Sequence, residues 1–118
     1  PINIKVVDDE DESNFVVFFG SQSGYNKICS SSIGLTEHNY GLFVVDGGNS
    51  ISGGSMYVDT ERSSTMSAKK HLLREELTQS LGLFNDTYDY PESIFYQEWT
   101  ETNEYAPIDI ELISMLYN

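Results

Sequence analysis

The strongest constraint on the fold is a helical pattern of apolar residues in the second half of the chain. These residues recur at the three- and four-residue spacing of one helix face: Met66, Leu72, Leu73, Leu77 and Leu81. Three residues that can cap a helix N-terminus stand directly before them: Ser63, Ser64 and Thr65. Gly82 follows the last apolar position, as is common at a helix C-terminus. The pattern predicts one helix of about four to five turns.

The first half of the chain has the residue pattern of a β-sheet. Residues 14–19 form a continuous apolar and β-branched run, typical of a strand buried on both faces. Further strands are expected at residues 2–7, 40–45 and 55–60. The alternation in the last of these suits a half-buried strand, and a sheet edge is one interpretation. The polar segment 21–32 is expected to be irregular, and residues 108–117 to form a closing amphipathic helix. This order predicts one α+β domain over residues 1–118.

The composition excludes some classes of function. Six Lys and Arg residues stand against nineteen Asp and Glu, which gives a formal charge of −13. Such a charge repels phosphate backbones and anionic membrane surfaces, so we expect no nucleic-acid partner. No run of about eighteen apolar residues is present, and no membrane-spanning segment is expected. Cys29 is the only cysteine, which excludes an internal disulfide and a structural zinc site of cysteines.

Residues 75–85 have the spacing of an extended zinc-binding helix, H-E-x-x-H-x-x-G-x-x-H. In that motif two histidines on one helix face bind zinc, and the glutamate polarises a water molecule. Here Glu75, Gln79 and Asn85 stand at the three ligand positions, and only the glutamate, Glu76, is kept. A carboxylate and two amides are harder and weaker zinc ligands than imidazoles. Tight zinc binding is therefore not expected.

Several alternatives remain open around this motif. Gly82 predicts that the chain turns back after the helix, and Asp86 takes the third ligand position if the alignment slips by one residue. His71, Glu75 and Gln79 share a helix stripe that could hold another cation, although a single surface histidine is the commoner case. Glu75 and Glu76 are read with about equal weight as ordinary surface helix formers. For Trp99, core packing is favoured over a place in a cleft.

These motifs carry a family resemblance. The stretch 71–83, followed by Asn85-Asp86 and residues 91–96, resembles an uncharacterised bacterial lipoprotein family whose members are similar to zincin metallopeptidases with an altered helix. The tail 107–118 resembles the last helix of metzincins, where an Asp-Ile pair precedes an apolar run. The resemblance implies a zincin-like α+β fold: a mixed sheet with an edge strand beside the altered active-site helix, and a C-terminal helix. Strand 55–60 would then form the edge of a substrate cleft.

The same resemblance implies an extracytoplasmic location in the periplasm or cell envelope, with room for a lipid anchor upstream of Pro1. A zincin half-domain usually begins with a strand and a long helix. That helix is not evident in this sequence. The resemblance therefore leaves open whether residues before Pro1 complete the domain.

Two functional interpretations follow. The preferred one is a metallopeptidase-like domain without catalytic activity that binds a peptide, a protein or an envelope component through the former cleft. It needs no cofactor. The alternative is a metal-dependent peptidase or hydrolase, with zinc or another divalent cation held by Glu75, Gln79 and Asn85 and with Glu76 as general base.

Overall fold

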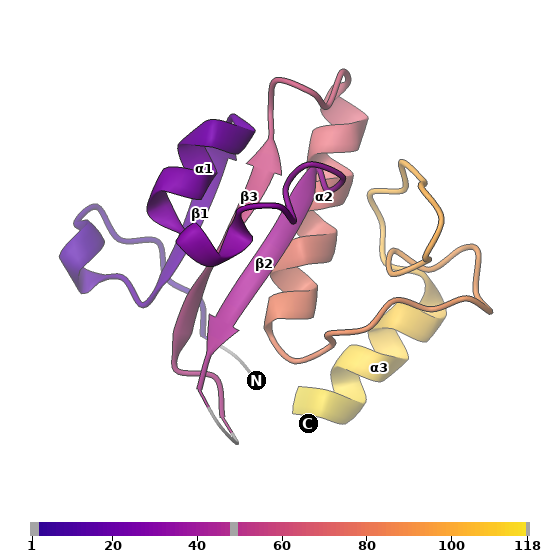
Figure 1. Cartoon of the computed structure of the whole chain (residues 1–118). Helices are drawn as coiled ribbons and strands as arrows, with labels where there is room; N and C mark the ends of the chain where they lie inside the picture. Colours follow the sequence, from indigo (N-terminus) through magenta and orange to yellow (C-terminus); the bar gives the residue numbers. More distant parts are fainter. Residues whose placement is uncertain (1–2, 48–49, 118) are drawn as a thin grey trace.

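The computed structural model describes residues 3–47 and 50–117 and shows a small α+β domain (Figure 1). Its strands are β1 (Phe15–Gly20), β2 (Gly41–Asp46) and β3 (Gly53–Asp59). Its α-helices are α1 (Gln22–Ile28), α2 (Met66–Ser80) and α3 (Pro107–Tyr117), and two short 3-10 helices span Glu10–Glu12 and Ser30–Ser32. Within the described residues, no helix is both long and apolar enough to cross a bilayer.

The three strands form one mixed sheet in the order β1-β3-β2. β1 runs parallel to β3, with Val17 opposite Met56. β2 runs antiparallel to β3, with Phe43 also opposite Met56. β3 therefore lies in the centre of the sheet, and β1 and β2 are its two edges.

Helix α1 lies on one face of the sheet and helix α2 on the other (Figure 1). Tyr25 of α1 stacks on Tyr57 of β3, with 4.7 Å between ring centroids, on one face. On the other face, Met56 and Val58 pack against Leu72 of α2 to form the buried core. Alternate residues of β3 thus serve two apolar layers, which is why its second half is buried.

Two strand predictions are wrong in their position within the sheet. Strand 55–60 was expected at the edge of a cleft, but β3 is the central strand. The alternation suggested that one side of this strand faces solvent. Tyr57 and Asp59 on that side are instead buried by partners on the α1 side of the sheet. Residues 14–19 were expected to be buried on both faces, but β1 is an edge strand, and the Phe19 side chain is 54% exposed.

Two local predictions are also wrong. Of the strand expected at residues 2–7, residues 3–7 are irregular, and residue 2 lies outside the described part. The segment expected to be irregular contains α1, whose N-terminus is capped by the Ser21 hydroxyl accepting from the Gly24 amide at 3.1 Å. The apolar packing of α1 through Tyr25 extends over too few residues to produce a recognisable helical period in the sequence.

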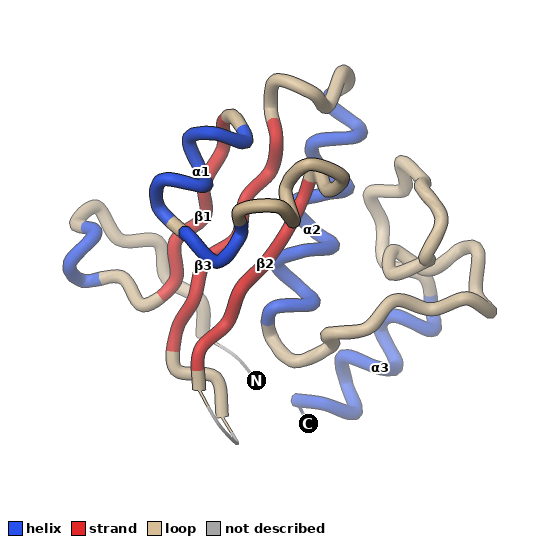
Figure 2. Tube along the Cα trace, viewed as in Figure 1, coloured by secondary structure: helices blue, strands red, loops and turns tan. Residues whose placement is uncertain are grey.

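The helix α2 ends close to the predicted place, and a long loop follows it (Figure 2). Thr65 is its N-cap, and its hydroxyl accepts from the Ala68 amide at 3.0 Å. Beyond its C-cap, Gly82 has φ +135°, a conformation that other residues rarely adopt. The loop between α2 and α3 then folds back along α2, with Ile94 and Phe95 buried in it. The predicted turn at Gly82 is confirmed.

Candidate functional site

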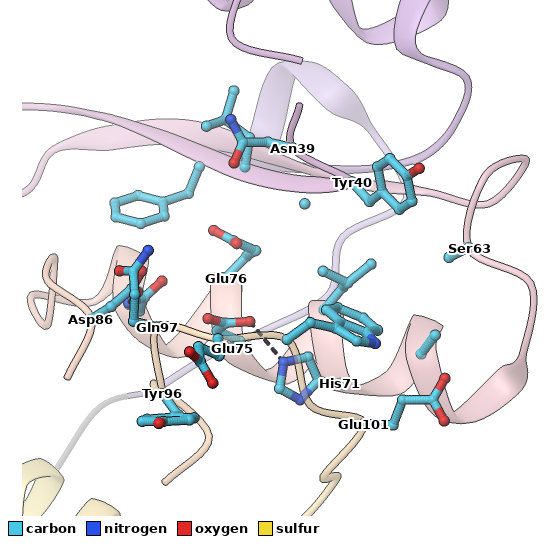
Figure 3. Close-up of a pocket in the computed structure, with 18 of the residues that line it drawn as sticks. Asn39, Tyr40, Ser63, His71, Glu75, Glu76, Asp86, Tyr96, Gln97 and Glu101 are labelled. Atoms are coloured by element: carbon cyan, nitrogen blue, oxygen red, sulfur yellow. Dashed lines mark hydrogen bonds and ion pairs between the residues drawn. The ribbon is translucent and has the colours of Figure 1, made fainter. Parts of the chain in front are cut away.

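A pocket of about 630 Å³ lies between strand β2, helix α2 and the loop that follows α2 (Figure 3). β2 and the segment before it supply residues 38–43, and α2 supplies one polar stripe. The stripe consists of His71, Glu75, Glu76 and Gln79. The loop contributes Phe84, Asp86 and residues 96–99 and 101. The volume is within the range of small-ligand sites.

Glu75 is bound to His71 on the same helix (Figure 3). The His71 Nε2 atom lies 2.9 Å from Glu75 Oε2, and its Nδ1 lies 2.7 Å from the Thr102 carbonyl oxygen. Because a carbonyl can only accept, Nδ1 carries a proton and donates it. Burial opposes the charged imidazole, but the hydrogen bonds to Glu75 and Thr102, together with the negative charges of Glu75 and Glu101, outweigh it and raise the pKa of His71. Both ring nitrogens are therefore engaged within the protein.

Gln79 is bound to Asp86 rather than to Asn85. The Gln79 amide nitrogen donates to Asp86 Oδ1 at 2.8 Å, and the Gln79 side chain is buried. Asn85 is exposed and does not line the pocket, so the structure places Asp86 at the third ligand position of the motif. The turn at Gly82 is what returns Asp86 to the end of α2.

Glu76 is a partly buried carboxyl group on the pocket side of α2. Its side chain points from α2 toward the start of β2 (Figure 3), and within the described residues its carboxylate makes no hydrogen bond or ion pair. Burial raises the pKa of Glu76 well above its ordinary value, and the negative charges of Glu75 and Asp86 raise it further. A carboxylate held in this way is available to a ligand.

Gly41 lets β2 approach α2 closely at Leu72 and Glu76. A Cβ atom at Gly41 would lie 2.9 Å from Leu72 Cδ2 and 3.0 Å from Glu76 Cγ, both closer than normal contacts. Any larger residue would require Leu72 or Glu76 to move. A glycine at the start of a strand carries no chemical signal of its own, so the sequence alone does not indicate this role of Gly41.

Arg62 fixes the segment that leads into β2. Its guanidinium pairs with the buried carboxylate of Asp59 and donates to the carbonyl oxygens of Thr36 at 2.6 Å and Glu37 at 3.0 Å. It also lies over the Tyr40 ring, 4.4 Å from its centroid. These contacts hold the segment before β2, which forms one wall of the pocket, in one position.

Asp109 fixes the loop between α2 and α3, which forms another wall of the pocket. This fully buried carboxylate accepts from the Ser93 hydroxyl, from the Ile94 amide at 2.9 Å and from the Ala106 amide at 2.9 Å. It stands in the first turn of α3, where an acid that bonds back to the preceding amide stabilises the helix start. Asp109, the first residue of the Asp-Ile pair of the tail, thus holds the loop that leads into pocket residues 96–99.

Aromatic side chains stand at the rim of the pocket and remain partly exposed. The Phe84 side chain is 50% exposed and packs against Phe43 of β2 at 5.8 Å between centroids. The Trp99 side chain is 57% exposed and lies edge-on to His71 at 5.2 Å. Core packing had been favoured for Trp99. It lines the pocket instead, while its neighbour Phe95 is buried.

The side chains at the motif positions do not fit a zinc ion. Glu75 and Gln79 are each bound to another side chain, and Asn85 is exposed and does not line the pocket. Nowhere in residues 3–47 and 50–117 do three or more His, Cys, Asp or Glu side chains form a group that could hold a metal ion. The polar groups instead form a hydrogen-bonded floor under an open cavity.

The unpartnered carboxylate has a measurable effect on stability. Since the pKa of Glu76 is raised in the folded protein, the folded state keeps a proton that the unfolded chain loses above its ordinary value of 4.5. Rising pH therefore lowers the free energy of unfolding through this group. We expect Glu76→Gln to raise the free energy of unfolding at pH 8 by about 1–2 kcal/mol, with the gain disappearing near pH 4.

Urea unfolding of both proteins between pH 4 and pH 8 checks this expectation. Glu111→Gln is the matched control, because it removes one carboxylate from the exposed face of α3. It should change stability by less than about 0.5 kcal/mol at every pH. If the free energy of unfolding depended on pH in the same way for the wild type and for Glu76→Gln, the pKa of Glu76 would not be raised in the folded protein.

The comparisons with known proteins give a family and no further relatives. A search of curated proteins and a search of solved structures each find no match. One family model matches residues 1–118, and its description is a protein of unknown function, DUF2927. Because the match covers the whole sequence, the chain belongs to the DUF2927 family.

Proposed function

We propose that this protein is a zincin-like domain without peptidase activity that binds an extended peptide or protein segment along the free edge of β2. The ligand's backbone would add a strand to the sheet, and one of its side chains would enter the pocket. An extracytoplasmic location, with an envelope peptide or protein as partner, belongs to the proposal and rests on the family resemblance alone.

The free backbone edge of β2 is the observation that carries the proposal. The Asp59 amide donates to the Tyr40 carbonyl at 2.7 Å, so Tyr40 and Asp59 face each other as a hydrogen-bonded pair. In an antiparallel pair these positions alternate. Gly41, Phe43 and Val45 therefore direct their amide and carbonyl groups away from β3, toward the side where a ligand strand would lie.

The pocket supports the same mode of binding. It starts directly beside Gly41 and Phe43 and is bounded by α2 on its other side. A side chain of an added strand that pointed toward α2 would enter it, because successive side chains of a strand alternate between the two faces. The hydrogen-bonded pairs His71–Glu75 and Gln79–Asp86 already fix the floor, so little ordering is required on binding.

Singly N-methylated peptides test strand addition without altering the protein. The probe is a blocked heptapeptide of serine and threonine with norleucine at its centre. Binding is followed by the fluorescence of Trp99, the only tryptophan, which stands at the pocket rim. Each peptide carries one N-methyl group. We expect methylation at alternate positions to weaken binding about tenfold or more, because only the amides at these positions face β2. Methylation of the amides between them should have little effect.

Two outcomes would contradict the proposal. Equal losses at all positions would exclude strand pairing, and no saturable signal up to about 1 mM peptide would exclude peptide binding at this site. The enzyme alternative has its own test. Stoichiometric transition metal in the purified protein, together with peptide cleavage that a chelator abolishes, would show that the domain is catalytic.

A further inference from the structure

We infer that the pocket beside Gly41 selects a basic side chain, the lysine or arginine of an extended peptide, with Glu76 as the group that receives its charge. This inference rests on the proposed peptide binding and names the class of peptide. It follows from the carboxyl group that the pocket leaves without a partner and from the aromatic side chains that line the pocket beside it.

The charges that line the pocket are predominantly negative after internal pairing. Arg62 is neutralised by Asp59, and His71 shares its proton with Glu75. Four of the carboxylates that line the pocket have no basic partner in the described part of the chain: Glu76, Asp86, Glu98 and Glu101. Asp86 and Glu101 accept hydrogen bonds from neutral groups, whereas Glu76 and Glu98 accept none there. Glu98 is exposed to solvent, and Glu76 is partly buried. A cationic side chain would displace the proton that burial favours on Glu76 and would pair with its carboxylate in a charge-assisted hydrogen bond.

The walls suit the aliphatic part of a long basic side chain. Phe84, which packs against Phe43, and Trp99, which lies edge-on to His71, both line the pocket and are half exposed. Apolar stems of lysine and arginine pack well on such rings, and their charged heads are attracted to the ring faces.

Replacing the central norleucine of the probe peptide tests the inference. Norleucine has the same unbranched chain as lysine without the ammonium group, so the two peptides differ only in the charged head. We expect lysine and arginine to bind at least about tenfold more tightly than norleucine, and glutamate to abolish binding. Moving the lysine by one residue, so that its side chain leaves the pocket face, should remove the gain.

Variants of the protein locate the charge that is responsible. Glu76→Gln should reduce the advantage of lysine over norleucine to less than about threefold. Glu111→Gln lowers the net negative charge equally and should keep the full advantage. Equal binding of lysine and norleucine, or of both lysine positions, would overturn the inference and leave peptide binding intact. Failure of every peptide to bind would overturn both.

Discussion

Replacing Asp109 by alanine is expected to lower the free energy of unfolding by about 3–5 kcal/mol. The Asp109 carboxylate is fully buried and accepts three hydrogen bonds, from Ser93, Ile94 and Ala106. Alanine would leave these three donors buried without an acceptor, and each such group costs about 1–3 kcal/mol. Urea unfolding followed by circular dichroism measures the loss.

Two further variants give this expectation its controls. Asp109→Asn keeps the shape and one acceptor oxygen, so about half of the loss is expected. Glu111→Ala, one residue past Ile110 on the exposed side of α3, should change stability by less than about 0.5 kcal/mol. A loss of less than about 1 kcal/mol for Asp109→Ala would mean that this carboxylate does not hold the loop.

Replacing Arg62 by methionine is expected to lower the free energy of unfolding by about 3 kcal/mol. Methionine keeps much of the length of the arginine stem but removes the positive charge and every donor. Asp59 would then be a buried carboxylate without its cation. The carbonyl oxygens of Thr36 and Glu37 would also lose their donors, so amide hydrogen exchange should accelerate across residues 36–40.

Arg74 offers a matched control for Arg62. Each arginine lies over a tyrosine ring, Arg62 over Tyr40 at 4.4 Å and Arg74 over Tyr105 at 4.9 Å, but only Arg62 has a buried carboxylate as partner. Arg74→Met should therefore cost less than about 1 kcal/mol. Equal costs for the two substitutions would show that stacking, and not the pair with Asp59, is what Arg62 contributes.

The sequence predicts the local elements of this fold better than their places in the sheet. The helix from Met66 to Ser80 follows from apolar spacing and from its cap at Thr65, which are local properties. The sheet order depends on partners distant in sequence. Tyr57 and Asp59 look like solvent-facing residues of an edge strand until Tyr25 and Arg62 are seen to cover them. Period alone cannot show such partners.

The candidate site was predictable in position but not in its bonding. The motif spacing brings Glu75, Glu76 and Gln79 to one pocket, and the turn at Gly82 follows from its residue type. The bond from Gln79 to Asp86 depends on a shift of one residue after that turn, which spacing leaves open. The roles of Gly41 and Trp99 depend on which strand is at the edge, and that was predicted wrongly.

Amide hydrogen exchange of β2, measured by NMR with and without the lysine-containing probe peptide, tests the central claim most directly. Leu42 directs its amide toward β3 and should exchange slowly in both states, because it is already bonded within the sheet. Gly41 and Phe43 direct theirs outward and should become protected only when peptide is bound. Protection of Gly41 and Phe43 that is unchanged at saturating peptide would contradict strand addition at this edge.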